Sequence, residues 1–340
     1  MSGELLTRDE FREGVFTRDS HRCVICGTEG KDAHHIMERR LFDNGGYFLE
    51  NGATLCENHH VLAEQTVLSC EEIRARSRIG TVILPDHLYF DERWDKWGNM
   101  ILKDGRRIRG ELFNDESVQK ILAAGGVLPL FLKWVKYPRT YHLPNSPGCT
   151  DDDRVLHNTS CFQGKRVIIT EKRDGENTTL YTDYVHARSV DSASHPTKDW
   201  IKNYQSQIGW NIPQGWRVCG ENLWAKHSIA YDNLASYFEA FSIWDDTNTC
   251  LGWDSSLEWF GLIGVEHVPV LYDGLWDDSL MEEFVPKDTD QEEGFVVRLA
   301  ERFHYSRFRV SVAKWVREDH VQTSHHWRRQ KIEKNKLNES

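Results

Sequence analysis

The stretch of sequence that decides the fold runs Lys165-Arg-Val-Ile-Ile-Thr-Glu-Lys172-Arg-Asp-Gly175-Glu-Asn177. Its first half is rich in β-branched residues and predicts a strand that ends at Lys172. A lysine at a strand end, two residues before Asp-Gly, is a candidate covalent nucleophile. Because a free lysine has a pKa of about 10.4, desolvation or nearby cations must help it to lose its proton. Gly175 allows the backbone to approach a ligand closely.

Strand patterns continue through the same half of the chain, with helical patterns between them. One such helical pattern is at Ser255–Gly261. This mixture indicates an α+β fold over residues 131–325. The strand patterns lie at 165–171, 178–185, 237–244, 294–299 and 309–316.

Five further short motifs follow the lysine in a fixed order. They are Ala187-Arg188-Ser189, Cys219-Gly220-Glu221-Asn222, Ala240-Phe241-Ser242-Ile243-Trp244-Asp245, Glu293-Gly294-Phe295-Val296-Val297-Arg298 and Val312-Ala313-Lys314-Trp315-Val316. Each motif alone is weak, but the ordered set resembles the covalent nucleotidyltransferases, which comprise RNA ligases, DNA ligases and capping enzymes. The resemblance covers residues 131–320 and implies an adenylyltransferase domain of antiparallel sheets with helices.

The resemblance implies a role for each motif. Lys172 would attack the α-phosphate of ATP and become a Lys–AMP intermediate. Phe241 would stack on the base, Glu221 would contact the ribose, and Glu293 would ligate Mg²⁺ or Mn²⁺. The other residues expected to bind nucleotide in the first motif are Glu171, Asp174 and Gly175.

Two features favour the RNA ligase branch of this superfamily. Only 26 residues follow Lys314, too few for the OB-fold domain expected after this motif in DNA ligases and capping enzymes. Asn177 completes a Lys-x-Asp-Gly-x-Asn pattern similar to that of nick-sealing RNA ligases. Lys314 and Arg188 would neutralise phosphate charge, and Arg317 could share this task because the second lysine of that branch is missing. The basic and aromatic run Lys136–His142 could help to dock RNA.

Cysteines and histidines cluster near the N-terminus. Cys23-Val-Ile-Cys26 and Cys56-Glu-Asn-His59 are two pairs with two-residue gaps, about thirty residues apart. Such a gap lets a tight turn aim both ligands at one ion, and two pairs complete a tetrahedral zinc shell. In a chain expected to be cytosolic, this spacing favours metal binding over disulfide formation.

The residues between and beside these pairs strengthen the interpretation. The order Cys-x2-Cys, His-His, Gly-Gly, Asn, Leu-Cys-x2-His-His resembles the HNH endonuclease module, a ββα fold that holds one catalytic metal. This resemblance implies that His35 is the general base and that His34 and His60 ligate the catalytic metal. Asn51 would hold the hairpin loop in place. Glu64 lies one helical turn after His60 and could support the site.

Composition and charge limit the class of protein. The chain has 340 residues with 39% hydrophobic and 28% charged residues, as in globular proteins of two to three domains. There is no run of about 18 apolar residues and no signal peptide, so no membrane segment and a cytoplasmic location are expected. A net charge of -11 argues against a protein that coats nucleic acid non-specifically. It is compatible with a protein that binds nucleic acid through a local basic surface.

The chain is expected to have four parts. A zinc-stabilised HNH module over residues 1–75 is followed by a connecting segment over 76–130. The ligase domain covers 131–325, and a basic tail covers 326–340. Within the first two parts the sequence predicts helices at 9–20, 58–69 and 116–124, and hairpins at 22–35 and around Asp104-Gly105.

We therefore interpret the chain as an ATP-dependent RNA ligase fused to an HNH nuclease module. It would join 5′-phosphate and 3′-hydroxyl ends in a nicked duplex or a broken RNA strand, in nucleic-acid repair. DNA is an alternative substrate for the HNH module. Two other interpretations stay open: a ligase with a non-cleaving zinc module that binds nucleic acid, and an HNH nuclease with a nucleotide-sensing, ligase-like domain.

Overall fold

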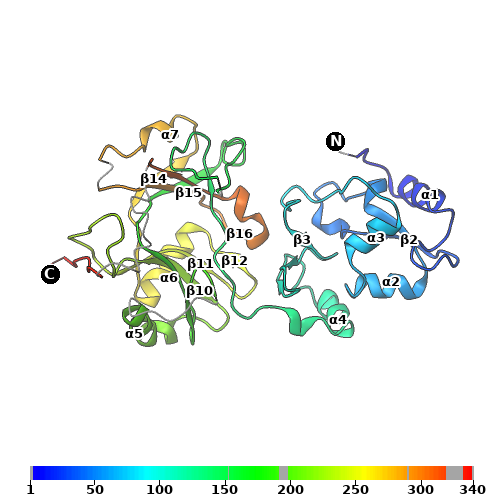
Figure 1. Ribbon diagram of the computed structural model, residues 1–340, viewed down its shortest axis with the longest axis horizontal. Helices are drawn as coiled ribbons and strands as arrows, with labels where there is room; N and C mark the ends of the chain where they lie inside the picture. Colours follow the sequence, from blue (N-terminus) through cyan, green and yellow to red (C-terminus); the bar gives the residue numbers. More distant parts are fainter. Residues whose placement is uncertain (1–2, 152, 191–197, 289–290, 319–331, 339–340) are drawn as a thin grey trace. The chain divides into compact units, whose positions relative to one another are not determined.

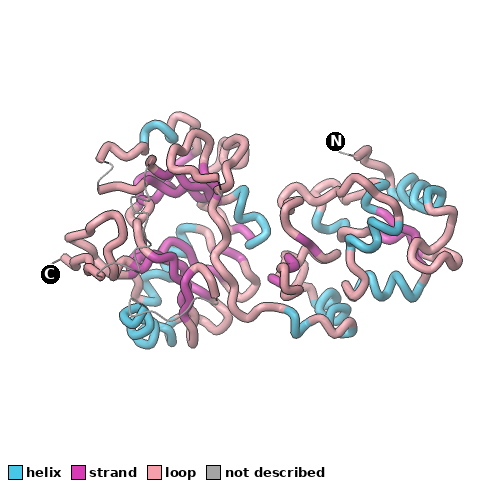
Figure 2. Tube along the Cα trace, in the orientation of Figure 1, coloured by secondary structure: helices cyan, strands magenta, loops and turns pink. Residues whose placement is uncertain are grey.

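The computed structural model describes residues 3–151, 153–190, 198–288, 291–318 and 332–338 (Figure 1). The chain divides after Lys133 into two compact units. The first is a small helical unit with short strands, and the second is built on two larger sheets (Figure 2). None of the helices in the described ranges is long and apolar enough to cross a membrane.

The first unit is organised around the antiparallel pair β1 (Asp32–His35) and β2 (Gly52–Leu55). The predicted hairpin at 22–35 is wrong, because β1 pairs with the fully buried β2 while residues 22–29 close on themselves through one bridge, Arg22 to Glu29. The predicted helix at 58–69 is shorter in the structure, because α2 ends at Glu64 and Ser69 caps a separate helix that begins at Cys70. The helices around the pair are α1 (Arg8–Arg18), α2 (Glu57–Glu64) and α3 (Cys70–Arg76).

Residues 76–130 pack within the first unit and do not stand apart as a connection. Leu88 and Trp94 belong to the same buried cluster as Met37, and the Trp97 indole donates to the Glu64 carbonyl at 2.7 Å. The predicted hairpin and helix of this segment are confirmed, and Gly105 turns the hairpin at φ +86°. The elements are β3 (Arg93–Trp94), β4 (Met100–Ile101), β5 (Arg107–Ile108) and α4 (Glu116–Ala124).

The second unit contains a five-stranded and a seven-stranded sheet, and the expected α+β fold of antiparallel sheets is confirmed here. The five-stranded sheet has the order β14 (Val270–Leu275), β7 (Arg166–Glu171), β15 (Gly294–Leu299), β17 (Val312–Val316) and β6 (Tyr141–His142), the last pair being parallel. The other sheet has the order β16 (Phe303–His304), β12 (Thr249–Cys250), β11 (Phe238–Trp244), β10 (Arg217–Asn222), β8 (Glu176–Leu180) and β9 (Val185–Ala187), with β13 (Glu266–His267) beside β11. The helices are α5 (Asp199–Ile208), α6 (Trp253–Ile263) and α7 (Leu280–Glu283).

Strand β7 is buried on both faces, which explains its run of β-branched residues. Val167 and Ile169 lie in one buried cluster with Phe162, whereas Ile168 lies in a second cluster with residues of α5 and α6. Because side chains alternate along a strand, Thr170 and then Lys172 continue the face of Ile168. This alternation directs the lysine towards the space between the two sheets.

Candidate active site

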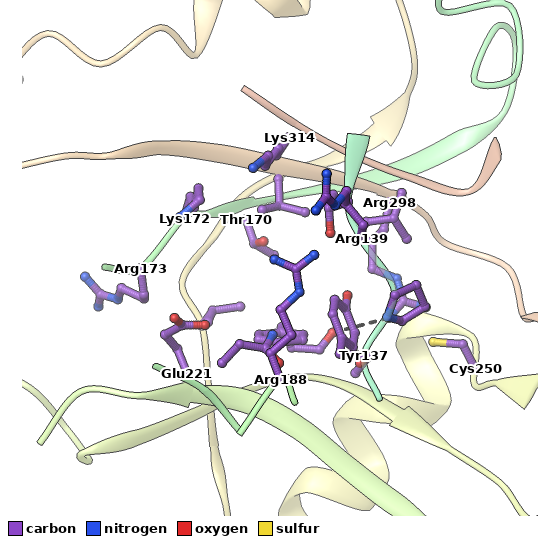
Figure 3. Close-up of a pocket in the computed structure, with 18 of the residues that line it drawn as sticks. Tyr137, Arg139, Thr170, Lys172, Arg173, Arg188, Glu221, Cys250, Arg298 and Lys314 are labelled. Atoms are coloured by element: carbon purple, nitrogen blue, oxygen red, sulfur yellow. Dashed lines mark hydrogen bonds between the residues drawn. The ribbon is translucent and has the colours of Figure 1, made fainter. Parts of the chain in front are cut away.

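A cleft with a cavity volume of about 210 Å³ lies between the two sheets of the second unit. Figure 3 shows Lys172 and Lys314 on the strands of one sheet, with Glu221 and Arg188 reaching in from the other. Alternation produces this lining, since Phe295, Val297, Ala313 and Trp315 fill the core behind the five-stranded sheet. The residues between them, Val296, Arg298, Val312 and Lys314, line the cleft.

Lys172 is held among carboxylates. Its Nζ lies 2.5 Å from Glu293 Oε2, and the two side chains are 23% and 6% exposed. Burial lowers the pKa of Lys172, but Glu293 and Glu221 outweigh this and leave the pKa raised. Burial also raises the pKa of Glu221 to about 8, against the opposing effect of Lys172. Without a ligand the lysine is therefore an ammonium, stabilised by acidic neighbours.

Gly294 is the reason that Glu293 can reach the lysine. Its φ of +149° is in the region that favours glycine, and a Cβ there would lie 2.1 Å from the Trp315 carbonyl oxygen. The unusual backbone interrupts the alternation of β15 at its first residue. Glu293 consequently turns to Lys172 and not to the core behind the sheet.

Two acceptors face each other on the seven-stranded sheet. Asn177 on β8 and Glu221 on β10 are direct cross-strand partners, and both line the cleft. The Asn177 Oδ1 atom is buried and has no hydrogen-bond partner among the described residues. Because a buried, unpaired acceptor is costly, this pair is suited to bind a ligand that donates hydroxyl protons.

The far end of the cleft is aromatic. Phe241 on β11 is half-buried and its ring contacts Tyr137 edge-on at 5.1 Å between centroids. Tyr137 and Arg139 line the cleft, although sequence analysis assigned the run Lys136–His142 to RNA docking. Nothing in the pattern of this run indicates that Tyr137 and Arg139 line the cleft.

Four of the residues predicted to bind nucleotide, Asp174, Gly175, Glu293 and Arg317, do not line the cleft. Of these, Glu293 contacts the cleft residue Lys172. The Asp174 carboxylate accepts hydrogen bonds from the backbone N–H groups of Ser228 and Ile229 at 2.7 and 2.8 Å. A Cβ on Gly175 would lie 2.6 Å from the Asn222 carbonyl oxygen, so this glycine is needed for strand packing. Arg317 lies just after the end of β17, where its backbone N–H donates to the Glu293 carbonyl at 3.0 Å. The other predicted lining residues, Glu171, Lys172, Asn177, Arg188, Glu221, Phe241 and Lys314, do line it.

The C-terminal segment braces the loop that Asp174 holds. Asn335 is 3% exposed; its side chain donates to the Leu223 carbonyl at 2.7 Å and accepts from the Tyr231 N–H at 3.0 Å. The Tyr231 hydroxyl in turn accepts from the Asp174 N–H at 2.9 Å. Residues 332–338 of the expected basic tail are thus packed against the second unit, and residues 326–331 lie outside the described ranges.

Asn335→Ala is expected to destabilise the second unit by about 2 kcal/mol, because it leaves a buried N–H and a buried carbonyl without partners. Urea unfolding followed by tryptophan fluorescence measures the effect. Asn338→Ala is the matched control, since Asn338 is exposed and its hydrogen bond to the Leu234 carbonyl, at 2.9 Å, is made by the backbone N–H. Equal midpoints for the two variants would contradict the bracing role.

The first unit brings the predicted zinc ligands together. Cys56 Sγ and Cys23 Sγ lie 3.2 and 3.5 Å from His59 Nδ1, and Cys26 Sγ lies 3.8 Å from Cys56 Sγ. A tetrahedral site with Zn–S bonds of about 2.3 Å separates its sulfur atoms by roughly 3.8 Å. The donor set and its spacing therefore fit one zinc ion.

A second cluster contains His34, His60 and Glu64. Glu64 Oε1 lies 3.4 Å from His34 Nδ1 and 3.2 Å from His60 Nε2. Lys96, which the sequence pattern did not indicate, has a side chain that is 4% exposed, and its Nζ lies 3.1 Å from the same Glu64 oxygen. It also donates to the His35 carbonyl at 2.8 Å. Two imidazoles and a carboxylate fit a divalent cation, and a buried lysine charge stands beside them.

His35 and Asn51 have different surroundings from this cluster. The His35 ring stacks on Phe11 at 4.4 Å and meets Tyr47 edge-on at 5.2 Å. Burial, followed by the charge of Lys96, lowers the pKa of His35 to about 4. Asn51 is buried and bonds the backbone of Met37 in both directions, at 2.9 and 3.0 Å. Asn51 therefore positions the loop.

Comparisons with known proteins agree with the geometry of the second unit. Residues 165–316 match the family model described as RNA ligase, which supports the RNA ligase domain predicted for this part of the chain. No curated protein sequence matches the chain. A Naegleria gruberi RNA ligase with PPi aligns at 18% identity and a TM-score of 0.39, over 54% of this chain and 56% of that one. An archaeal ATP-dependent RNA ligase aligns at 14% and 0.37, over 54% and 48%. The chain thus spans about half the length of these ligases.

Proposed function

We propose that the second unit is an ATP-dependent RNA ligase that acts through a Lys172–AMP intermediate. The Lys172 amine attacks the α-phosphorus of ATP, a P–N bond forms, and pyrophosphate leaves. An RNA 5′-phosphate oxygen then displaces the lysine and takes the AMP, after which a 3′-hydroxyl displaces AMP and seals the strand. The observation that carries this proposal is the position of Lys172 in the cleft, beside Glu293, within the part of the chain that matches RNA ligase.

The cleft offers a group for each part of the nucleotide. Phe241 stacks on the base, and the opposed acceptors of Asn177 and Glu221 take the ribose hydroxyls. Arg188 and Lys314 neutralise phosphate charge. The attack needs the neutral amine, so the Lys172 proton must leave when ATP binds. A divalent cation held by Glu293 would supply positive charge that offsets the carboxylates and the phosphates.

Phe241→Ala is expected to weaken ATP binding by about 1–3 kcal/mol, the usual worth of base stacking on an aromatic ring. Equilibrium binding of ATP, measured by calorimetry, tests this. Phe90→Ala is the control, because Phe90 is 73% exposed in the first unit. Unchanged affinity in the Phe241 variant would place the base elsewhere.

Sealing of a nicked strand tests the proposal as a whole. The purified chain is incubated with ATP, Mg²⁺ or Mn²⁺, and a duplex with a 5′-phosphate and a 3′-hydroxyl at the nick. We expect a joined strand on a denaturing gel when the nicked strand is RNA. The absence of both a joined strand and a protein–AMP adduct under these conditions would refute the ligase proposal.

We further propose that the first unit is an HNH nuclease stabilised by zinc, so that one chain cuts and seals during nucleic-acid repair. Cys23, Cys26, Cys56 and His59 would hold the zinc. His34 and His60 would hold the catalytic cation, and the His35 ring would take a proton from the attacking water while the 3′-oxygen leaves. The substrate is a phosphodiester strand of RNA or DNA.

Zinc analysis tests the structural site. We expect about one zinc per chain, and we expect Cys23→Ser to release it and to unfold the part of the first unit that the ion joins. Elemental analysis and circular dichroism are the measurements, and Cys161→Ser in the second unit is the control. Full zinc content in Cys23→Ser would exclude this ligand set, whereas adenylylation of Lys172 is expected to survive the substitution.

A non-cleaving nucleic-acid clamp is the second candidate for the first unit, and Lys96 favours it. Its buried ammonium group contacts Glu64 at 3.1 Å and supplies a positive charge where a catalytic cation would otherwise supply one. In this alternative the ion pair stabilises the unit and the arrangement binds a strand without cutting it. Cleavage by the wild-type chain with any of Mg²⁺, Mn²⁺ or Ni²⁺ would exclude the clamp.

A further inference from the structure

A polar groove lies on the first unit next to His35. Arg8 and Arg12 reach it from α1, where a spacing of four residues puts both on one helix face, and Arg39 reaches it from the short helix Arg39–Leu41. Tyr47 completes the wall beside His35. The groove has a cavity volume of about 310 Å³, and neither His34 nor His60 lines it.

The three arginines of this groove lack the acidic partners that Arg18 and Arg40 of the same unit have. Arg18 pairs with Asp19 at 2.8 Å, and Arg40 pairs with Asp115 at 2.8 Å. Among the described residues, no carboxylate forms an ion pair with Arg8, Arg12 or Arg39. The acidic residue of the groove, Asp32, lies 3.2 Å from the His60 ring.

Three guanidinium groups without a carboxylate partner line one groove in a chain with a net charge of -11. Their contacts are neutral, since Arg12 lies over the Phe16 ring at 5.1 Å and Arg39 donates to the Tyr47 hydroxyl at 3.5 Å. Like charges gathered in one concave site raise the local concentration of anions. Guanidinium groups bind phosphate oxygens with paired hydrogen bonds, and several in a row suit an anion that repeats along a strand. His35 at the end of the groove is the residue proposed to act on a phosphodiester.

We propose that Arg8, Arg12 and Arg39 form the phosphate-binding groove of the first unit and hold the sugar-phosphate backbone of the strand that His35 faces. The choice of a nucleic-acid backbone as the ligand rests on the proposed nuclease function. The groove contacts phosphates and not bases, so it binds RNA and DNA strands of any sequence.

The test compares the full-length double variant Arg8→Gln/Arg12→Gln with wild type. Fluorescence anisotropy measures the affinity for short labelled single strands of RNA and of DNA over a range of salt concentrations. Each phosphate contact contributes about 0.7 to the salt slope on single strands, so we expect the slope to fall by about 1.4 and the affinity at low salt to fall at least about tenfold. Photocrosslinking of a thio-substituted strand then reports adducts on peptides of the first unit separately from those of the second.

Arg76→Gln is the matched control, because Arg76 is an exposed arginine of the same unit outside the groove. Normal zinc content and normal Lys172 adenylylation show that each variant is folded. If the double variant binds and crosslinks like Arg76→Gln, the groove proposal is wrong, even where wild type cleaves. If the affinity and the first-unit crosslinks fall although wild type cleaves nothing, the groove stands and the nuclease proposal fails.

Discussion

Lys172→Arg is expected to form no covalent nucleotide adduct when the protein is incubated with labelled ATP and Mg²⁺ or Mn²⁺. In the wild-type chain, Glu293 lies 2.5 Å from the lysine Nζ, and arginine keeps a positive charge beside it. A guanidinium group stays protonated, however, and cannot attack phosphorus. The variant therefore removes the nucleophile with little disturbance of the acidic pocket. The adduct is read as acid-labile label on the protein band of a denaturing gel.

The control for this prediction is Lys165→Arg, which changes an exposed lysine at the start of the same strand. It is expected to form the adduct at the wild-type rate. Retained ATP binding by Lys172→Arg separates loss of chemistry from loss of the site. An adduct that persists in Lys172→Arg, for example on Lys314, would overturn the assignment of the nucleophile and with it the mechanism.

Local pattern predicted several strands of the second unit and the side chains they direct into the cleft. The strand expected at 178–185 is instead the hairpin of β8 and β9, and the strand expected at 309–316 begins only at Val312, because residues 305–310 form a 3-10 helix. The strand expected at 165–171 is β7, and the two-residue period carries its face to Lys172. The same period makes Arg298 and Lys314 face the cleft, since apolar neighbours on either side fill the core. Such predictions succeed because a few consecutive residues determine both which face of the strand is buried and which face lines the cleft.

Contacts between distant parts of the chain could not be predicted in this way. Asp-Gly after a lysine looks the same whether the carboxylate faces a nucleotide or, as here, the loop at Ser228, 54 residues away. Asn335 and Tyr231 are 104 residues apart, and Lys96 donates to a carbonyl 61 residues before it. These three residues gain their roles from packing, for which the sequence around them has no period or motif.

His35→Ala is expected to reduce strand cleavage by the wild-type chain by about 10²–10⁴-fold, the usual contribution of a positioned general base. His35 is outside the Cys23, Cys26, Cys56 and His59 group, so the variant is expected to keep its zinc. It also leaves Lys172 untouched, and sealing of a nicked duplex is expected to match wild type. Cleavage is measured on labelled RNA and DNA strands with Mg²⁺, Mn²⁺ or Ni²⁺.

His21→Asn is the matched control for His35→Ala, because His21 is an exposed histidine of the same unit. Its φ of 56° is one that asparagine tolerates, so the control is expected to fold and to cleave normally. Two results would count against the general base. Equal cleavage by His35→Ala and wild type would assign the proton transfer to another group. The first unit would be a clamp if the wild-type chain cuts no strand but loses affinity for nucleic acid when its zinc is removed. Strand binding needs only the folded groove, whereas cleavage needs His35 as well.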